Sequence, residues 1–191
     1  SANDRLRVRD VRAAAGAVRG AGAVLASLEV PMAAVSEAAR LAAVCGVPFV
    51  LNPAPARSLP AALLRRVHTL TPNESEAALL SGEDEPARAA SILCERGCRN
   101  VVVTLGERGV VACGEAGAFT IPARKVGAVD TVGAGDCFSG WLAVGIAEGL
   151  LFREAVSRAM AAASLAVQRP GAQSGMPHRR EVEAVLRQIR P

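Results

Sequence analysis

The stretch "GAVLASLEVPMAAVSEAARLAAVCGVPFVLN", residues 22–52, places a segment of helical period between two apolar runs of strand length. Residues 22–30 and 47–52 form the apolar runs, and residues 32–46 repeat small and apolar side chains at helical spacing. The helical segment closes at Gly46, a residue type that suits a helix C-terminus. Apolar strands that alternate with helices are typical of a parallel sheet whose two faces are covered. The stretch therefore predicts an α/β fold.

The alternation continues along the rest of the chain. We expect helices at residues 59–67, 73–82, 85–97, 134–148, 152–168 and 179–189, and strands at 68–73, within 100–114 and at 117–123. The segment 100–114 reads as two β runs joined at a tight glycine turn, so this part of the sheet is expected to be antiparallel. No internal repeat or low-complexity linker divides the 191 residues, which indicates one domain with a sizeable core.

Composition narrows the class of protein. No apolar run approaches the roughly 20 residues that a membrane span needs. The first ten residues, "SANDRLRVRD", are charged where a signal peptide would be apolar, so we expect a cytoplasmic protein with no membrane partner. The net charge is +4, but the arginines are dispersed and the chain has one Trp, four Phe and no Tyr, which argues against a nucleic-acid partner. Five scattered cysteines indicate reduced thiols instead of zinc ligands or disulfides.

The segment "AVDTVGAGDCFSG", residues 128–140, combines glycines with acidic residues at the start of an expected helix. Gly133 and Gly135 lack a Cβ, so backbone N–H groups there can approach a ligand closely. A helix that starts near Ala134 directs these groups at developing negative charge. Asp136 in the first turn could then accept a proton from an alcohol that attacks a phosphoryl group. Spacing alone leaves open a second interpretation, in which Asp130 or Asp136 only caps the helix.

The segment "TPNESEA", residues 71–77, carries a similar ambiguity. Asn73 and Glu76 have the spacing of a capping box, which needs no function to explain it. At the end of a parallel strand, however, both side chains would face the crevice where α/β sheets bind ligands, and Glu76 could hold a hydrated Mg²⁺. The segment "TLGERG", residues 104–109, matches neither a Walker loop nor a dinucleotide fingerprint and reads as a hairpin turn.

Six collinear segments together resemble the C-terminal part of the PfkB family of sugar and nucleoside kinases, in particular its ribokinase group. They are "LEVP", "LNPAPA", "TPNESEA", "VVVTLGERGV", "AVDTVGAGDCFSG" and "QRPGAQ". The resemblance covers essentially residues 1–190 and implies a three-layer α/β/α, ribokinase-like (Rossmann-like) sheet. The family's N-terminal strands, β lid and G-G-x-x-x-N substrate motif have no counterpart in this sequence. Residues 1–191 are therefore expected to be the C-terminal part of a single PfkB domain, with an incomplete sheet.

The resemblance implies a role for individual residues at the reacting centre. Asp136 matches the catalytic base, which also contacts the sugar, and Glu29 matches a carboxylate that binds sugar hydroxyls. The amides of Gly133, Ala134, Gly135 and Asp136 match the anion hole for the transferring phosphoryl group. Glu76 matches a residue that acts on Mg²⁺ through water.

Two further sets follow from the same resemblance. The nucleotide-binding positions are Asn73, Thr104, Leu105, Gly106, Glu107, Arg108, Gly109, Gly135 and Met160. The positions of an activating monovalent cation are Asp130, Val132, Ala166, Arg169, Gly171 and Gly175. Met160 stands where relatives commonly carry Asn or His, and Gly175 stands where Ser is usual, so a polar contact to adenine and a hydroxyl ligand are lost.

The implied activity is ATP-dependent phosphorylation of D-ribose to ribose 5-phosphate, with Mg²⁺ and K⁺ as cofactors and a homodimer as the complete protein. Without the lid and the sugar motif, catalysis by residues 1–191 alone is expected to be impaired, because positioning and water exclusion both suffer. Two alternatives stay open. One is a related PfkB sugar or nucleoside kinase, and the other is a non-catalytic product that binds nucleotide or associates with other subunits.

Overall fold

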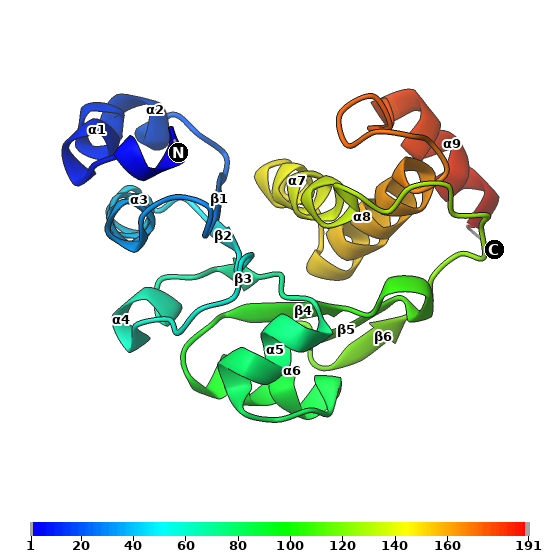
Figure 1. The fold of residues 1–191 in the computed structure, drawn as a ribbon, viewed down its shortest axis with the longest axis horizontal. Helices are drawn as coiled ribbons and strands as arrows, with labels where there is room; N and C mark the ends of the chain where they lie inside the picture. The colour runs from blue at the N-terminus through cyan, green and yellow to red at the C-terminus, as the bar shows by residue number, and fades with distance from the viewer. Residues whose placement is uncertain (1, 190–191) are drawn as a thin grey trace.

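A computed structural model describes residues 2–189 as one six-stranded sheet between two layers of helices (Figure 1). The strands are β1 (Val24–Ser27), β2 (Phe49–Asn52), β3 (Thr69–Leu70), β4 (Asn100–Thr104), β5 (Val110–Gly114) and β6 (Phe119–Ile121). They lie in the order β1-β2-β3-β4-β5-β6, parallel from β1 to β4 and antiparallel from β4 to β6. The predicted parallel sheet with an antiparallel portion is therefore confirmed.

Helices cover both faces of this sheet, which confirms the three-layer α/β/α class. One layer contains α3 (Met32–Cys45), α4 (Ala61–Leu64), α5 (Glu74–Ser81) and α6 (Pro86–Glu95), and the other contains α7 (Ala134–Ala147) and α8 (Phe152–Ala166). Successive side chains of β4 point to opposite faces of the sheet. Val101 and Val103 pack in the core under α3–α6, whereas Val102 packs in the core under α7 and α8.

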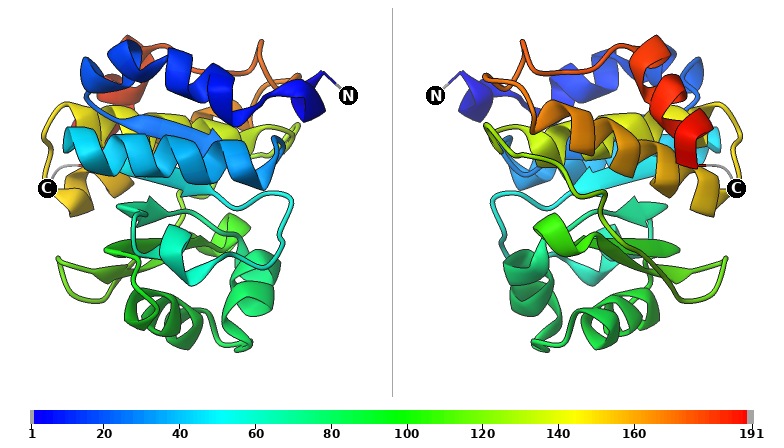
Figure 2. Two further views of the ribbon diagram at one scale, coloured as in Figure 1. Left: turned by 90° about the vertical axis from the view of Figure 1, so that its left-hand side faces the viewer. Right: turned by 90° about the vertical axis from the view of Figure 1, so that its right-hand side faces the viewer.

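Shorter or peripheral elements complete the chain. The helices α1 (Val8–Ala13) and α2 (Ala15–Arg19) pack on α3, and α9 (Arg179–Ile189) packs on α8. Two 3₁₀ turns, η1 (Asn3–Arg5) and η2 (Gly106–Arg108), lie at the N-terminus and between β4 and β5. In the side views, α1, α2 and α9 lie toward one end of the molecule, and α5 and α6 lie at the other (Figure 2). None of the described helices has the length and apolar character that a membrane span requires.

Several strands and helices are shorter than predicted, for local reasons. The strand expected at 22–30 ends at Ser27 because the N–H of Leu28 turns to the carbonyl of Ala54, at 2.9 Å. The strand expected at 68–73 keeps only Thr69–Leu70, since Pro72 has no N–H to donate to a ladder. All five cysteines are free thiols, as expected.

Strand β1 forms one edge of the sheet in the described part of the chain. It pairs with β2 alone, and the side chain of Leu25 is 43% exposed. On α7, the helix that contacts β1, Val144 is 39% exposed. An open edge with exposed apolar side chains agrees with the expectation of an incomplete sheet.

Candidate active site at the carboxyl edge of the sheet

Helix α7 runs against the direction of the parallel strands. A Cβ added to Gly22, just before β1, would lie 2.8 Å from the Cβ of Ala147 at the end of α7. Near the start of α7, the hydroxyl of Ser139 lies 2.9 Å from that of Thr71, which directly follows β3. The N-terminus of α7 therefore lies at the carboxyl edge of the sheet, where open α/β folds bind ligands.

The first turn of α7 presents unpaired backbone donors. Gly133 is the N-cap at φ 77°, and a Cβ there would lie 3.0 Å from the Cβ of Ala172, so both conformation and space require glycine. The N–H of Ala134 donates to the carbonyl of Thr131 at 3.2 Å. Within residues 2–189, the N–H groups of Gly133, Gly135 and Asp136 make no hydrogen bond. Of the four amides predicted to form the anion hole, that of Ala134 is thus engaged by Thr131, whereas those of Gly133, Gly135 and Asp136 have no partner among the described residues.

Asp136 is exposed in this first turn. Its carboxylate makes no hydrogen bond or ion pair with any described residue, and α7 has no side-chain cap. The interpretation of Asp130 or Asp136 as a helix cap is therefore wrong. A free carboxylate beside free amides can accept a proton while the amides hold an anion.

A cavity of about 300 Å³ opens beside Asp136 and was not anticipated from the sequence. It is lined by Asp136, Cys137, Gly140, Trp141, Val144 and Met176. Gly140 and Val144 follow Asp136 at intervals of four, so helical periodicity places them on the same face and could have identified them. Nothing local in the sequence connects Met176 with that face.

Asn73 and Glu76 form the predicted capping box at the start of α5. The Oδ1 of Asn73 accepts the N–H of Glu76 at 2.9 Å, and the Oε2 of Glu76 accepts the N–H of Asn73 at 2.8 Å. Capping leaves the other polar atoms available, because the Asn73 Nδ2 and the Glu76 Oε1 have no hydrogen-bond partner among the described residues. Glu76 is 9% exposed, and no side-chain oxygen buried from solvent lacks a partner in residues 2–189, so its Oε1 is accessible to water or to a ligand.

The turn at residues 104–109 lies beside this capping box. Thr104 forms a parallel bridge with Asn73, and its N–H donates to the carbonyl of Pro72 at 2.9 Å. The guanidinium of Arg108 pairs with Glu74 on α5. The predicted hairpin turn is confirmed, and two segments assigned to the nucleotide are adjacent.

Within this turn, two of the assigned positions are constrained by packing. Leu105 is 8% exposed and packs in the α3–α6 core, and its N–H donates to the carbonyl of Gly109 at 2.8 Å, so neither its side chain nor its N–H is available to a ligand. Gly109 adopts φ 100°, and a Cβ there would lie 2.1 Å from the carbonyl oxygen of Ile121. Gly106 and Glu107 are exposed.

Met160 lies on α8, which returns toward the carboxyl edge because it follows α7 through a short connection. Its side chain is half-buried against the core that contains Val110 and Phe138. The thioether therefore contributes apolar packing at this position, where Asn or His would add a hydrogen bond.

Asp130 connects the loop before α7 with the loop after α8. Its Oδ1 accepts the N–H of Val132 at 2.9 Å, and its Oδ2 accepts the N–H of Gly171 at 2.8 Å. These two donors, Val132 first, hold the pKa of Asp130 below its usual value. The N–H groups of Val129 and Asp130 also donate to the carbonyl of Val167, at 2.7 and 3.1 Å.

Three of the carbonyls assigned to a monovalent cation converge in this loop. A Cβ added to Gly175 would lie 2.8 Å from the oxygen of Gly171 and 3.3 Å from the oxygens of Ala166 and Arg169. Carbonyl oxygens grouped in this way are suitable ligands for K⁺. The donor set of this chain therefore fits the predicted cation, although the hydroxyl that serine would supply is missing.

The expected Mg²⁺ site, unlike the cation loop, is not a cluster of protein ligands. Within the described residues, no three His, Cys, Asp or Glu side chains gather in a way that would hold a metal ion. Mg²⁺ usually keeps several waters and takes few protein ligands, so the single free oxygen of Glu76 is a compatible donor.

The loop after α8 is also tied to α9 by a residue that sequence reasoning missed. Arg169 donates to the Oε1 of Glu181 at 2.5 Å, and the Oε2 of Glu181 accepts the N–H of His178 at 2.7 Å. The guanidinium of Arg169, followed by the His178 amide, lowers the pKa of Glu181 to about 2. No short-range pattern indicates that Glu181 meets Arg169.

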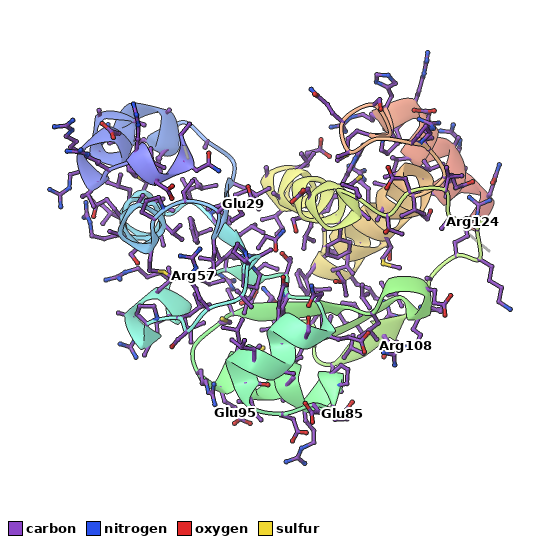
Figure 3. The ribbon with its side chains drawn as sticks, in the orientation of Figure 1. Glu29, Arg57, Glu85, Glu95, Arg108 and Arg124 are labelled. Atoms are coloured by element: carbon purple, nitrogen blue, oxygen red, sulfur yellow. The ribbon has the colours of Figure 1, made fainter. Side chains whose placement is uncertain are left out.

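Glu29 follows β1 and is exposed. Figure 3 shows it on the side of β1 that faces α7. The guanidinium of Arg57 donates to the carbonyl of Leu28, which fixes the adjacent loop against the end of β1. Glu29 has no side-chain partner among the described residues and is free to bind a ligand.

Comparisons with known proteins agree with this geometry. A family model described as "pfkB family carbohydrate kinase" matches residues 3–179. The ribokinase of Haemophilus influenzae is 37% identical over 185 residues, which cover 94% of this chain and 60% of that protein. The crystal structure of a ribokinase from Thermotoga maritima matches with a TM-score of 0.89 at 35% identity, covering 97% of this chain and 62% of that one.

A further solved structure, the Arabidopsis thaliana ribokinase complexed with ribose and ATP, matches with a TM-score of 0.85 at 32% identity. The match covers 95% of this chain and 59% of that chain. The present chain therefore spans about three-fifths of the length of these relatives.

Proposed function

The chain belongs to the pfkB family of carbohydrate kinases, and from this premise we propose that the protein containing it transfers the γ-phosphoryl group of ATP to the 5-hydroxyl of D-ribose. Residues 1–191 are the C-terminal part of one kinase domain in this proposal. The observation that carries it is the first turn of α7, where the free amides of Gly135 and Asp136 lie beside an unpaired carboxylate. D-ribose is the proposed acceptor because relatives over nearly the whole chain are ribokinases.

Phosphoryl transfer depends on positioning and on charge stabilisation. In the proposed reaction, the carboxylate of Asp136 accepts the proton of the 5-hydroxyl. At the same time, the hydroxyl oxygen of the sugar forms a bond to the γ-phosphorus. The bond from that phosphorus to the β–γ bridging oxygen breaks, and ADP leaves with the electron pair. The amides at the α7 N-terminus stabilise the charge on the transferring group, and Glu29 accepts hydrogen bonds from other sugar hydroxyls.

The nucleotide is proposed to lie along the adjacent Asn73 and Thr104 segments. The Nδ2 of Asn73 is a free donor for a phosphate oxygen, and the turn at 104–109 forms the wall beside it. Mg²⁺ bound here would neutralise phosphate charge, with the Oε1 of Glu76 accepting a hydrogen bond from its water shell. The Asp130 loops and their converging carbonyls would hold K⁺ next to Gly133, and so order the anion hole.

Three expectations remain predictions: the cytoplasmic location, the homodimer and the dependence on K⁺. An experiment distinguishes this kinase from the rival proposal, a non-catalytic product that binds nucleotide. ADP formation is measured with Mg-ATP and D-ribose for the polypeptide that contains residues 1–191, and ATP affinity is measured in parallel.

We expect ribose-dependent ADP formation with ribose 5-phosphate as the product, and a lower rate with 2-deoxyribose or adenosine as acceptor. Preference for another acceptor would replace D-ribose with that substrate in the same family. Nucleotide binding without transfer to any sugar or nucleoside would support the non-catalytic product.

A further inference from the structure

Two buried hydroxyls join the layers of the fold beneath the candidate active site. The Oγ1 of Thr71 and the Oγ of Ser139 lie 2.9 Å apart, and their side chains are only 4% and 2% exposed. The Oγ1 of Thr71 is also 3.4 Å from the carbonyl oxygen of Leu51. One arrangement satisfies both donors: Ser139 donates to Thr71, and Thr71 donates to Leu51.

The two residues belong to the two halves of the proposed reaction centre. Thr71 lies two positions before Asn73, on the nucleotide side. Ser139 lies three positions after Asp136, one helical turn farther into α7. Within residues 2–189, theirs is the only hydrogen bond that joins α7 to the segment 69–76.

We propose that the Thr71–Ser139 hydrogen bond is a positioning contact that sets the N-terminus of α7 against the nucleotide-binding segment. The inference rests on the proposed function, and neither hydroxyl touches a substrate. A misplacement of about 1 Å in a reacting group can cost on the order of 100-fold in rate, so one fixed distance between the two segments matters. A hydrogen bond between buried hydroxyls supplies that constraint because it is directional and its partners have little access to water.

A matched control is available two residues earlier. The Oγ1 of Thr69 lies 2.9 Å from the Nδ1 of His68, and Thr69 is fully buried. Replacing either threonine by valine keeps the shape. Thr69→Val removes the partly buried hydrogen bond to His68, and Thr71→Val removes the buried one to Ser139 together with the longer one to Leu51. Only Thr71→Val removes the link to α7, so a general loss of stability is common to both variants and a loss of positioning is not.

The first test is amide hydrogen exchange on the unliganded polypeptide that contains residues 1–191. Thr71→Val is expected to raise exchange about five-fold at the hydrogen-bonded amides of the first two turns of α7, from Cys137 onward, the effect of losing roughly 1 kcal/mol of local stability. Thr71→Ser, which keeps a hydroxyl, and Thr69→Val should leave these amides unchanged. Ser139→Ala is expected to raise exchange at the hydrogen-bonded amides of Asn73 and Glu76, and the Thr71→Val/Ser139→Ala double variant should exceed neither single effect.

The second test is kinetic and uses the active polypeptide that contains residues 1–191. Thr71→Val is expected to lower kcat about ten-fold with an unchanged KM for ATP, and Thr71→Ser is expected to restore kcat. Thr69→Val should leave kcat at the wild-type level.

The outcomes separate this inference from the proposed function. Unchanged exchange in α7 for Thr71→Val, or equal losses of kcat for Thr71→Val and Thr69→Val, would overturn the positioning role. Faster exchange in α7 for Thr71→Val would support the coupling of the two segments in the unliganded protein, whatever its activity. A separate result is possible, in which the wild-type protein transfers no phosphoryl group to D-ribose. That last result would overturn the proposed function instead.

Discussion

Asp130 and Gly171 are 41 positions apart, yet the Oδ2 of Asp130 accepts the N–H of Gly171 at 2.8 Å. The Oδ1 of the same carboxylate accepts the N–H of Val132 at 2.9 Å, one residue before the N-cap of α7. One side chain thus holds together the two loops that surround the candidate cation site. The geometry of the proposed anion hole would depend on both loops, because Ala172 packs against Gly133.

Replacing Asp130 by Asn is expected to release one of these loops. An amide has a single acceptor oxygen, so it cannot accept both N–H groups in the observed way. We expect kcat to fall about ten-fold or more, with a small change in the KM for ATP and a weakened response to K⁺. Turnover measured against K⁺ concentration checks this, and an unchanged K⁺ response in Asp130→Asn would count against the assigned role.

The cation site is tested by restoring a hydroxyl. Gly175→Ser and Gly175→Ala introduce the same Cβ, 2.8 Å from the backbone oxygen of Gly171, so both require the same displacement of backbone atoms in the loop. Only serine adds an oxygen near the converging carbonyls. We expect Gly175→Ser to reach half-maximal activation at a K⁺ concentration several-fold below that of Gly175→Ala, with Na⁺ as the reference salt. Equal K⁺ requirements in the two variants would contradict a cation at this position.

The N-cap of α7 allows conformational strain to be separated from steric contact. Gly133 and Gly149 have φ values of 77° and 72°, but a Cβ meets Ala172 only at Gly133. Alanine at either position is expected to cost on the order of 1 kcal/mol, because L residues disfavour this backbone region. Only Gly133→Ala should also lower turnover. Thermal unfolding with steady-state kinetics checks both expectations, and normal turnover in Gly133→Ala would argue against the anion hole.

The tie between Arg169 and Glu181 predicts a pH dependence of stability. The folded-state pKa of Glu181 is about 2, below the ordinary value of 4.5, so folding favours the ionised carboxylate. Its stabilising contribution is present above pH 4.5 and is lost as the pH falls toward 2. The difference in Tm between wild type and Glu181→Gln should therefore shrink on acidification.

Glu183→Gln is the matched control for this pH effect, since Glu183 lies on the same helix and makes no side-chain hydrogen bond with described residues. Its Tm difference from wild type should change less over the same pH range. A difference for Glu181→Gln that does not depend on pH would show that the pair contributes nothing through its charge.

The fold was predictable from the sequence to the extent that it depends on local patterns. The apolar runs around residues 32–46 predicted β1, α3 and β2, and Asn73 with Glu76 predicted the start of α5. Contacts between residues far apart in the chain have no corresponding pattern in the sequence. Thr71 and Ser139 are 68 positions apart, and each reads separately as an unremarkable hydroxyl.

The candidate site shows the same division. Glycine spacing and Asp136 indicated an anion-binding helix start, but the engagement of the Ala134 amide by Thr131 depends on the conformation of the preceding loop. The resemblance to the family indicated a candidate cation loop, whereas the attachment of this loop to α9 through Glu181 required the packed structure. The residues of the candidate site could therefore be predicted from the sequence, whereas the long-range contacts that position them could not.

The most direct test of the central claim is the ribose-dependent turnover of Asp136→Asn, compared with Asp84→Asn. Both substitutions replace one exposed carboxylate with an amide of the same shape, and Asp84 lies between α5 and α6, outside the candidate site. In the polypeptide that contains residues 1–191, we predict that Asp136→Asn abolishes transfer to D-ribose and leaves ATP affinity little changed. Asp84→Asn should match wild type in both. Near-normal kcat in Asp136→Asn would contradict the assignment of Asp136 as the catalytic base.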